Sequence, residues 1–411
     1  MGISAKYINT MKNLYTHAKA RIRVANLFTE EVSISKGVMQ GDSISTVLFI
    51  LFLNDIKEYL ENHGLRGVNI NPTQNIISLL YCDDLILFAD SKAELQKMLN
   101  SLEKYCEENK MIVNEKKTKI VIFRRGGRIK DSDVLYYKHK KLEIVSTFNY
   151  LGVSFSSHAV FHQAAEQANS KGRAAIASVK RTMSASQMKS WDSRKKLLEA
   201  CVKTTLLYGA EIWAFRYVDN IEKCQSFLFK TLYCLPRNTP NYTIRLEMGV
   251  VKLSHSVFLQ MLRWWMKLLM MAQDRYPKLC YLELCALDQR SCNIEKYNWA
   301  TQLKRQLVEL GFAQVWESQD ASVVKSNMED ILEKLKENLI NADIERCRNS
   351  TYSTLYRDLK PLDNIPSVSP YLQLSLPMDT CRVLAQIRLG SNQAVRIYTK
   401  GITYTWDTEE T

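Results

Sequence analysis

The spacing of apolar and polar residues divides the chain into a mixed N-terminal region and a helical remainder. Short alternating or wholly apolar segments predict strands at Ala20–Asn26, Glu30–Val38, Asn75–Leu80, Leu85–Asp90, Ile112–Phe123 and Leu142–Ser156. Two longer segments with apolar residues at helical spacing, Ser45–Asn62 and Ser91–Lys110, predict helices in the same region. This mixture is typical of an α+β fold.

The helix expected at Ser91–Lys110 has the strongest local signals. Ser91 followed by Glu94 forms a capping box, in which the two side chains bind the free backbone N–H groups of the first turn. Apolar residues fall on one face of this helix, at Leu95, Leu99, Leu102 and Tyr105.

After about Ala159 the pattern predicts helices almost throughout. Their segments are Ala159–Met183, Ser193–Phe215, Asn220–Leu235 and Ser256–Gln273. Trp264 and Trp265 fall within the last of these apolar helices, so we interpret them as core residues and not as a stacking platform. From about Tyr276 the helices become more polar, and a tail with several prolines follows Lys360.

Composition and charge narrow the class of protein. The chain has 411 residues, of which 46% are hydrophobic and 24% charged, so we expect folded domains. Lys and Arg outnumber Asp and Glu by 56 to 43, and the net charge of +13 favours a polyanionic partner such as nucleic acid. No apolar run is long enough to span a bilayer, and the expected location is intracellular, without a membrane partner.

Two adjacent acids, Asp83 and Asp84, lie between two apolar runs. On a straight strand their side chains would point to opposite faces, so both reach one site only if the chain turns there in a tight hairpin. Paired carboxylates repel unless a cation lies between them, and Mg²⁺ is the natural choice because it takes hard oxygen ligands. The alternative is a solvated turn, where Asp is common.

Four ordered motifs carry a family resemblance. They are the segments Lys36–Ile56, Tyr81–Asp84, Val113–Lys119 and Phe148–Val153. In order and approximate spacing they resemble the reverse transcriptases of non-LTR, LINE-type retrotransposons. Two later stretches, Leu206–Phe215 and Leu235–Val250, resemble the region that follows the polymerase palm in those elements.

The resemblance implies a fold and three regions. The fold class is α+β, a partial polymerase palm of antiparallel strands with helices, followed by a mainly α-helical thumb and C-terminal region. Residues 1–155 would be the partial palm with its primer-grip hairpin, residues 156–275 a helical thumb or connection region, and residues 276–411 a helical C-terminal region with an irregular tail.

The resemblance also implies roles for residues of the catalytic site. Asp83 and Asp84 match the metal-binding hairpin, with Tyr81 beside them, and the expected cofactor is Mg²⁺ or Mn²⁺. Gln40 and Gly41 match a turn where bare backbone lets template and nucleotide approach, although Gly41 also suits an ordinary helix entry. Lys117 matches a cation near the leaving pyrophosphate, with a solvated strand end as the alternative.

Other residues are expected to contact the primer and template. The primer grip corresponds to Phe148, Tyr150, Leu151 and Gly152, although core packing would also explain Phe148 and Leu151. A basic run suits backbone phosphates, or else forms a solvated helix face. Its members are Arg124, Arg125, Arg128, Lys171, Arg173, Lys180 and Arg181.

The function implied is part of an RNA-directed DNA polymerase. It would transfer nucleotides from dNTP to a primer 3′-OH on an RNA template by a two-metal mechanism, in the nucleus, with an RNA template and a DNA primer as partners. A third catalytic carboxylate is not found: the chain begins after the point where the family carries it, and Asp42, Asp55 and Asp90 are not replacements. We therefore expect a truncated piece that is inactive by itself. The alternative is an element-derived, non-catalytic nucleic-acid-binding protein.

Overall fold

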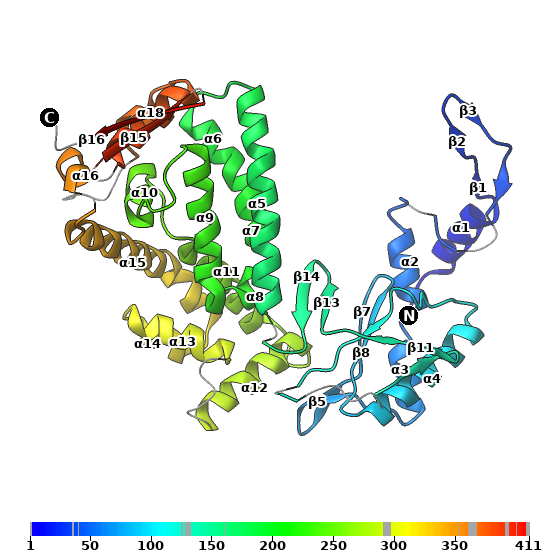
Figure 1. Cartoon of the computed structure of the whole chain (residues 1–411). Coiled ribbons are helices and arrows are strands. Elements are labelled where there is room, and N and C mark those ends of the chain that lie inside the picture. The colour runs from blue at the N-terminus through cyan, green and yellow to red at the C-terminus, as the bar shows by residue number, and fades with distance from the viewer. Residues whose placement is uncertain are drawn as a thin grey trace. The chain divides into compact units, whose positions relative to one another are not determined.

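The computed structural model describes residues 2–34, 37–39, 41–124, 126–127, 133–159, 161–290, 297–352, 354–360, 368–390, 394–399 and 401–407. By packing, the chain forms two compact units. We call Met1–Glu115 with Asp133–Lys141 the N-terminal unit, and Lys116–Ser132 with Leu142–Thr411 the helical unit. Figure 1 labels the elements of each.

In its described residues, the N-terminal unit contains short strands and four helices. Its helices are α1 (Ala5–Thr16), α2 (Ser45–Phe52), α3 (Ile56–Asn62) and α4 (Lys92–Glu108). Its strands are β1 (Lys19–Ala20), β2 (Arg23–Val24), β3 (Leu27–Phe28), β4 (Val32–Ser33), β5 (Val68–Asn71), β6 (Gln74–Ile76), β7 (Ser78–Tyr81), β8 (Asp84–Leu87), β10 (Tyr136–Tyr137) and β11 (Lys140–Lys141). Antiparallel pairs form between β1 and β4, β2 and β3, β5 and β6, β7 and β8, and β10 and β11.

Helix α4 follows the sequence prediction closely. The Ser91 hydroxyl accepts a hydrogen bond of 3.2 Å from the Glu94 N–H, which confirms the cap. The apolar face is buried at Leu99, Leu102 and Tyr105, and it packs on α3. These residues form the small core of the N-terminal unit, together with Leu60, whose side chain is fully enclosed.

The single long helix predicted for Ser45–Asn62 is wrong. The structure divides it into α2 and α3, with a turn at residues 53–55. Asp55 lies in that turn and accepts a hydrogen bond of 2.5 Å from the Tyr105 hydroxyl of α4. Asn54 has a low helix propensity, which favours a break in the helix at this turn.

The helical unit begins with two pairs of strands and continues as helices. Its strands are β9 (Lys119–Ile120), β12 (Glu143–Ile144), β13 (Thr147–Tyr150), β14 (Val153–Ser156), β15 (Ala394–Thr399) and β16 (Ile402–Asp407). The β9–β12 pair is parallel, and the β13–β14 and β15–β16 pairs are antiparallel hairpins. Only Lys119–Ile120 of the strand predicted at Ile112–Phe123 is a strand, so that prediction was too long.

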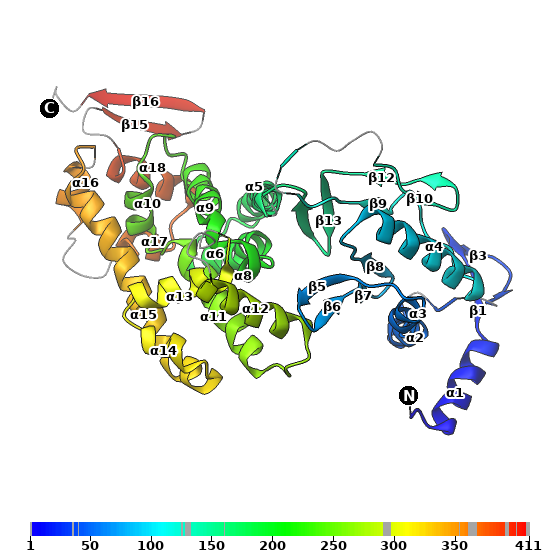
Figure 2. The same cartoon turned by 90° about the horizontal axis from the view of Figure 1, so that it is seen from below.

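The helices of this unit pack around one another over most of its length. They are α5 (His162–Ala185), α6 (Trp191–Leu197), η1 (Leu198–Lys203), α7 (Thr204–Leu206), α8 (Ala210–Trp213), η2 (Phe215–Tyr217), α9 (Val218–Leu232), α10 (Asn241–Met248), α11 (Leu253–Met270), α12 (Tyr276–Arg290), α13 (Trp299–Glu309), α14 (Ala313–Ser318), α15 (Ala321–Arg348), α16 (Thr354–Leu359), α17 (Pro370–Gln373) and α18 (Met378–Arg388). The helix predicted for Ser193–Phe215 is interrupted after Leu206, where Gly209 adopts a left-handed φ of 64°. Figure 2 shows α5 beside α9, and β15 over α18.

One hydrophobic core joins the helices from α5 to α18. It includes Trp265, which is fully buried and stacks on Trp316 with ring centroids 5.4 Å apart, as expected for a core residue. A buried ion pair also lies in this core: Nε and Nη2 of Arg245 each donate a 2.6 Å bond to the Asp343 carboxylate. By packing, residues 276–411 are thus continuous with the preceding helices, and the boundaries predicted at residues 155 and 275 stay predictions. In the part of the chain that the structure describes, no helix is long and apolar enough to cross a membrane.

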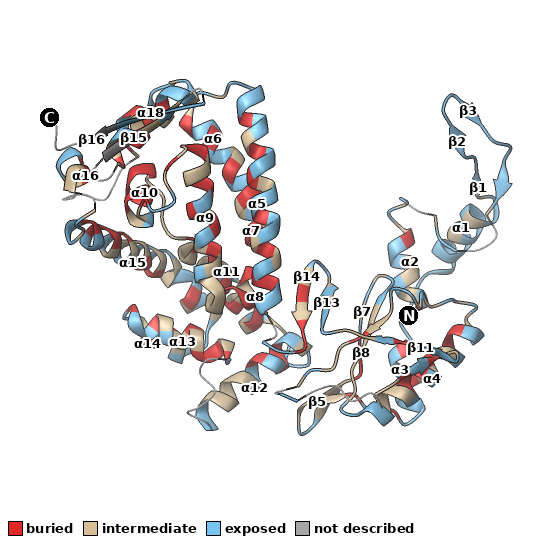
Figure 3. Ribbon diagram, viewed as in Figure 1, coloured by how far each residue is buried: buried red, intermediate tan, exposed pale blue. Residues whose placement is uncertain are grey.

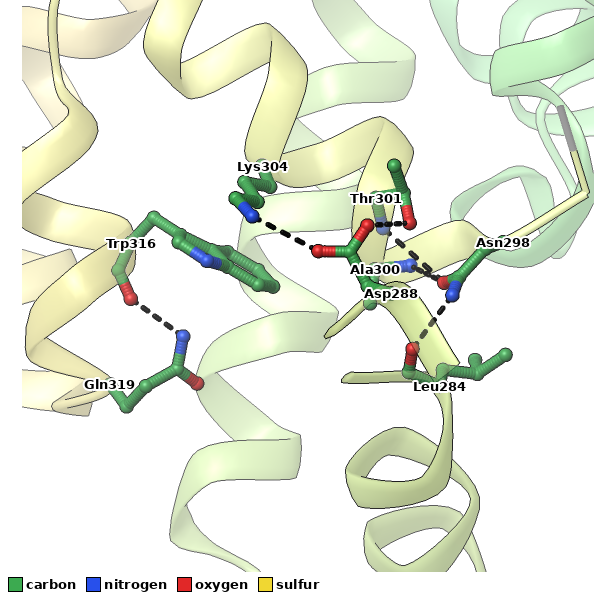
Figure 4. A network of polar contacts seen from close by, with 8 residues as sticks. All are labelled: Leu284, Asp288, Asn298, Ala300, Thr301, Lys304, Trp316 and Gln319. Atoms are coloured by element: carbon green, nitrogen blue, oxygen red, sulfur yellow. Dashed lines mark hydrogen bonds and ion pairs between the residues drawn. The ribbon is translucent and has the colours of Figure 1, made fainter. Parts of the chain in front are cut away.

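Polar contacts also join the helices α12 and α13 (Figure 4). Asn298 caps α13 by accepting from the Ala300 and Thr301 N–H groups, and its amide donates to the Leu284 carbonyl of α12. Asp288 of α12 accepts bonds from Thr301, at 2.5 Å, and from Lys304, at 3.0 Å. These two donors lower the pKa of the Asp288 carboxyl, with the Thr301 bond as the larger cause.

Candidate functional site

The two acids of the candidate metal site lie at the end of the β7–β8 hairpin. Tyr81 pairs with Asp84, so the two-residue turn consists of Cys82 and Asp83. Cys82 has a positive φ of 52° and Asp83 does not, which is the pattern of a type II′ hairpin turn. The predicted tight hairpin is confirmed, but its tip lies one residue earlier than expected, because Asp84 is the first residue of β8.

Both carboxylates and the neighbouring Tyr81 side chain are exposed. Tyr81 retains 58% of its accessible surface, and it lies opposite Asp84 in the ladder. The base of the hairpin is held by fully buried Ile77, whose carbonyl accepts a 2.9 Å bond from the Phe88 N–H. The hairpin thus presents hard oxygen donors to solvent on a fixed backbone. This arrangement fits Mg²⁺, which keeps several waters and shares its remaining positions with phosphates.

The three acids excluded above as replacements for the third carboxylate are placed differently. Asp42 caps the approach to α2 by accepting a 3.2 Å bond from the Ile44 N–H, and Asp55 is held by Tyr105. Asp90 is exposed at the end of the segment that follows β8. Over the residues that the structure describes, no group of three or more His, Cys, Asp or Glu side chains is arranged to hold a metal ion.

The turn before α2 contains Gly41 at a φ of 89°, in open space on the side where a side chain would project. A left-handed φ favours glycine, and the open surroundings leave the backbone accessible there. Ser45 fixes the turn by donating a 2.6 Å bond to the Met39 carbonyl. Gln40, the other residue predicted in this motif, lies outside the described residues.

Lys117 is exposed in the turn at residues 115–117, just before β9. It therefore does not lie on a strand, contrary to the sequence prediction. By packing, Lys117 belongs to the helical unit.

The residues predicted as primer grip form the β13–β14 hairpin. Phe148 pairs with Phe155 and Tyr150 pairs with Val153, so Leu151 and Gly152 make the turn. Both have positive φ angles, 47° and 84°, as a type I′ turn requires. Phe148 and Tyr150 are half-buried, whereas Leu151 is exposed. The hairpin is confirmed, and Leu151 is not a core residue.

The basic residues predicted to bind phosphates do not all project from the same side of α5. Lys171, Arg173 and Arg181 are exposed on this helix, and Lys180 is half-buried. At about 100° per residue, Arg173, Lys180 and Arg181 fall within about 100° of arc, while Lys171 projects from another side. Arg173 lies over the Phe227 ring of α9, 4.7 Å from its centroid. Arg125 and Arg128 lie outside the described residues, and Arg124 is half-buried with its Nε enclosed.

Two contacts at the β13–β14 hairpin were missed from the sequence. The Tyr208 hydroxyl donates a 3.0 Å bond to the Leu151 carbonyl, and the Lys171 ammonium donates a 3.3 Å bond to the Gly152 carbonyl. Tyr208 belongs to the segment Leu206–Phe215, which carried part of the resemblance but received no role. The sequence signal was the pair Tyr208–Gly209, because glycine after a large residue in a helical stretch indicates a turn.

Comparison with known proteins identifies the N-terminal part of the chain. Residues 2–155 match the family model for reverse transcriptase (RNA-dependent DNA polymerase). A retrovirus-related Pol polyprotein from type-1 retrotransposable element R2 of Popillia japonica is 31% identical over 165 residues, 39% of this chain and 26% of that protein. The corresponding R2 polyprotein of Nasonia vitripennis is 25% identical over 154 residues, 35% of this chain and 15% of that protein.

A transposon-derived protein of Caenorhabditis elegans is also similar, with 27% identity over 146 residues, 34% of this chain and 50% of that protein. The match to the two R2 polyproteins spans only about a quarter or less of their lengths. Asp83, Asp84 and the β13–β14 hairpin all lie inside or at the end of the matched region. Residues 2–155 are therefore similar to reverse transcriptases, including those of R2 retrotransposable elements.

Proposed function

We propose that this chain is the primer-binding portion of an RNA-directed DNA polymerase, together with part of its catalytic portion. The observation that carries the proposal is the β7–β8 hairpin, which holds two exposed carboxylates inside the region that matches the reverse transcriptase family. The proposed partners are an RNA template and a DNA primer, with dNTP as the substrate of the whole enzyme.

The residues would divide the work as follows. Asp83 and Asp84 hold Mg²⁺ or Mn²⁺. When bound, such ions activate a primer 3′-hydroxyl and neutralise the charge of the triphosphate. Lys117 places a cation near the leaving pyrophosphate. Gly41 leaves its backbone open to the template, and the β13–β14 hairpin positions the primer end.

The helical unit would bind the backbone of the duplex. Arg173, Lys180 and Arg181 project from one side of α5, and Arg173 is held in place by its contact with Phe227. Each phosphate contact releases a counterion, so binding should weaken as salt rises. Each cation that is lost should lower the slope of log K against log salt by about one.

We further propose that the chain alone does not extend a primer. Two-metal transfer in this family uses a third carboxylate, while Asp42 and Asp55 are engaged by Ile44 and Tyr105. In this view the hairpin contributes two ligands to a site that other parts of a larger protein complete. A non-catalytic nucleic-acid-binding role remains the alternative.

The metal site can be tested with Fe²⁺ as the probe. Iron bound in place of Mg²⁺ generates hydroxyl radicals with ascorbate and peroxide, and these cleave the backbone close to the ion. We expect cleavage near residues 81–85 that excess Mg²⁺ suppresses and that Asp83→Asn abolishes. Asp90→Asn removes an exposed carboxylate outside the site and should leave the cleavage unchanged. Cleavage that persists in Asp83→Asn would refute the assignment.

Polymerase function needs a separate assay with a DNA primer on an RNA template. We expect salt-dependent binding, and no extension with Mg²⁺ or Mn²⁺ by the chain alone. Extension that depends on Asp83 would disprove the inactivity but support the polymerase assignment. Absence of any binding to the primer–template would overturn the proposed function.

A further inference from the structure

We propose that Tyr208 and Lys171 are positioning residues for the Leu151–Gly152 turn, and through that turn for the 3′ end of the primer. The first half of this proposal concerns only the chain itself. The second half rests on the function proposed above. The two halves are therefore tested separately.

The turn needs support because its backbone is unfavourable. Leu151 has a φ of 47°, a left-handed conformation that side chains other than Gly, Asn and Asp rarely adopt. Such a residue persists only where its surroundings hold it there. Leu151 is 38% exposed, so burial of its side chain supplies little of that support.

Both carbonyls of the turn are held from outside the hairpin. The Tyr208 hydroxyl donates to the Leu151 oxygen at 3.0 Å, and the Lys171 Nζ donates to the Gly152 oxygen at 3.3 Å. The Tyr208 ring also lies against the turn, since a Cβ added to Gly152 would come within 3.1 Å of its Cε1. The φ of 84° and this contact together explain the glycine at position 152.

The backbone around Tyr208 directs its side chain to the turn. The chain leaves the helix at Leu207, and Gly209 takes a left-handed φ of 64° that allows α8 to begin in a new direction. Buried Trp213 then fixes the Tyr208 carbonyl with a 3.1 Å bond from its indole N–H. Both ends of Tyr208 are thus hydrogen-bonded, although its side chain is 59% exposed and gains little from burial.

A cavity of about 390 Å³ lies beside the turn, within the helical unit. Its walls include Gly152 and Val153 from the hairpin, Gln167 and Lys171 from α5, and Tyr208. Because the turn borders open volume on this side, van der Waals packing does not fix it there. On this side the turn is held by the two hydrogen bonds and the Tyr208 ring, in addition to the strand pairing of Tyr150 with Val153.

This inference also gives Lys171 a different role from the other basic residues of α5. Lys171 projects away from the side that carries Arg173, Lys180 and Arg181, and its ammonium is directed to the Gly152 carbonyl. Removing it should therefore move the turn and leave the salt dependence of duplex binding nearly unchanged. A phosphate contact would do the reverse.

The structural half is tested by hydrogen exchange of the Tyr150 and Val153 amides, which flank the turn in the β13–β14 ladder. Tyr208→Phe removes the hydroxyl and keeps the ring, and we expect these amides to exchange about two- to ten-fold faster, the range that one neutral hydrogen bond supplies. Tyr242→Phe is the matched control, since it removes a tyrosine hydroxyl bond to Ser350 elsewhere in the same unit. Unchanged exchange in Tyr208→Phe would overturn the proposal.

Lys171 provides a second, independent variant. Lys171→Met should also accelerate exchange at the turn, and Lys171→Arg, which keeps a donor, should restore most of the protection. Equal exchange in both variants would show that the Lys171 bond does not hold the turn.

The primer half uses photocrosslinking with 4-thiothymidine at the primer 3′ end. We expect crosslinks to the hairpin at residues 148–152 in the full chain. Tyr208→Phe should reduce them at least three-fold, while a probe placed ten nucleotides upstream crosslinks as before and duplex affinity changes less than two-fold. An undiminished 3′-end crosslink in Tyr208→Phe would overturn the positioning role. If the unmodified chain binds no primer–template, the proposed function fails, while the exchange experiment still decides whether Tyr208 and Lys171 hold the turn.

Discussion

The two units place the same kind of residue in opposite surroundings. In the N-terminal unit, most of which is coloured exposed or intermediate in Figure 3, Asp83 lies in the turn of the β7–β8 hairpin and Asp84 begins β8, and both are exposed. In the helical unit, Asp343 and Glu247 are buried and receive charge-assisted hydrogen bonds from Arg245 and Arg388. Burying these charges without such partners would destabilise the fold, so Asp343 and Glu247 have a structural role. The exposed pair is available for a ligand.

The same contrast holds for apolar residues. The core of the helical unit is continuous from α5 to α18, whereas the N-terminal unit has a small core around α3 and α4. Strands β1 to β4 carry apolar side chains that remain largely exposed, Leu27 at 76% among them. We infer that stability resides mainly in the helical unit. All seven tryptophans lie in this unit, so tryptophan fluorescence reports on its unfolding alone.

The largest expected effect is that of Trp265→Ala. This fully buried ring stacks on Trp316 and donates a 2.8 Å bond to the Tyr281 hydroxyl. Its removal should lower the free energy of unfolding by about 3–5 kcal/mol, as large-to-small changes in cores do. Urea titration followed by tryptophan fluorescence measures the loss. Trp264→Ala, at a half-buried neighbouring position, should cost clearly less, and equal losses would contradict the assignment of Trp265 to the core.

Breaking the buried ion pair should come next. Arg245→Met leaves the Asp343 carboxylate buried without its partner and should cost about 3 kcal/mol. The double variant Arg245→Met with Asp343→Leu replaces both charges by apolar groups and should recover most of that loss. Thermal unfolding of the two variants measures the difference. A double variant no more stable than the single one would show that the pair stabilises the unit through its charges.

A smaller effect is expected at the α4 cap of the N-terminal unit. Ser91→Ala removes the bond to the Glu94 N–H and should cost about 1 kcal/mol. Hydrogen exchange of the α4 amides measures this loss, and the tryptophan-detected midpoint should not move. Ser4→Ala removes the corresponding cap of α1, which buries no residue, so it should leave α4 unaffected. If the two units unfolded together in one transition, Ser91→Ala would instead shift the tryptophan-detected midpoint.

The smallest effect concerns Asp288. Its pKa is lowered in the folded state by the Thr301 hydrogen bond and by Lys304, so the carboxylate form is stabilised by folding. This contribution is present above about pH 4, the ordinary range of an Asp carboxyl, and is lost as the pH falls through the folded pKa. As the pH falls from about 5 to about 3, the stability of the helical unit should therefore decrease slightly more in the unmodified chain than in Asp288→Asn. Identical pH profiles of the unmodified chain and Asp288→Asn would contradict a stabilising role for the Asp288 contacts drawn in Figure 4.

Much of the local structure could be predicted from the sequence. Ser91 with Glu94 predicted the start of α4, and the two apolar runs that flank Asp83 and Asp84 predicted a hairpin. The prediction of a continuous helix through Asp55 was wrong: a turn at residues 53–55 lies where Asp55 accepts a bond from Tyr105, fifty residues away, and no local pattern encodes that contact. Tyr208 received no role because its partner Leu151 is 57 residues distant, and no local pattern encodes that contact.

The sequence by itself determined the cap of α4, the presence of the β7–β8 hairpin and the family resemblance, because these depend on residue types within a few positions and on ordered motifs. It did not determine which charges would be buried, since Arg245 meets Asp343 across 98 residues only when α10 packs on α15. Nor did it divide the basic residues of α5, where the direction of each side chain follows from how the helix docks. The tertiary structure decided these features because contacts between distant segments form only when the apolar faces of the helices are buried together.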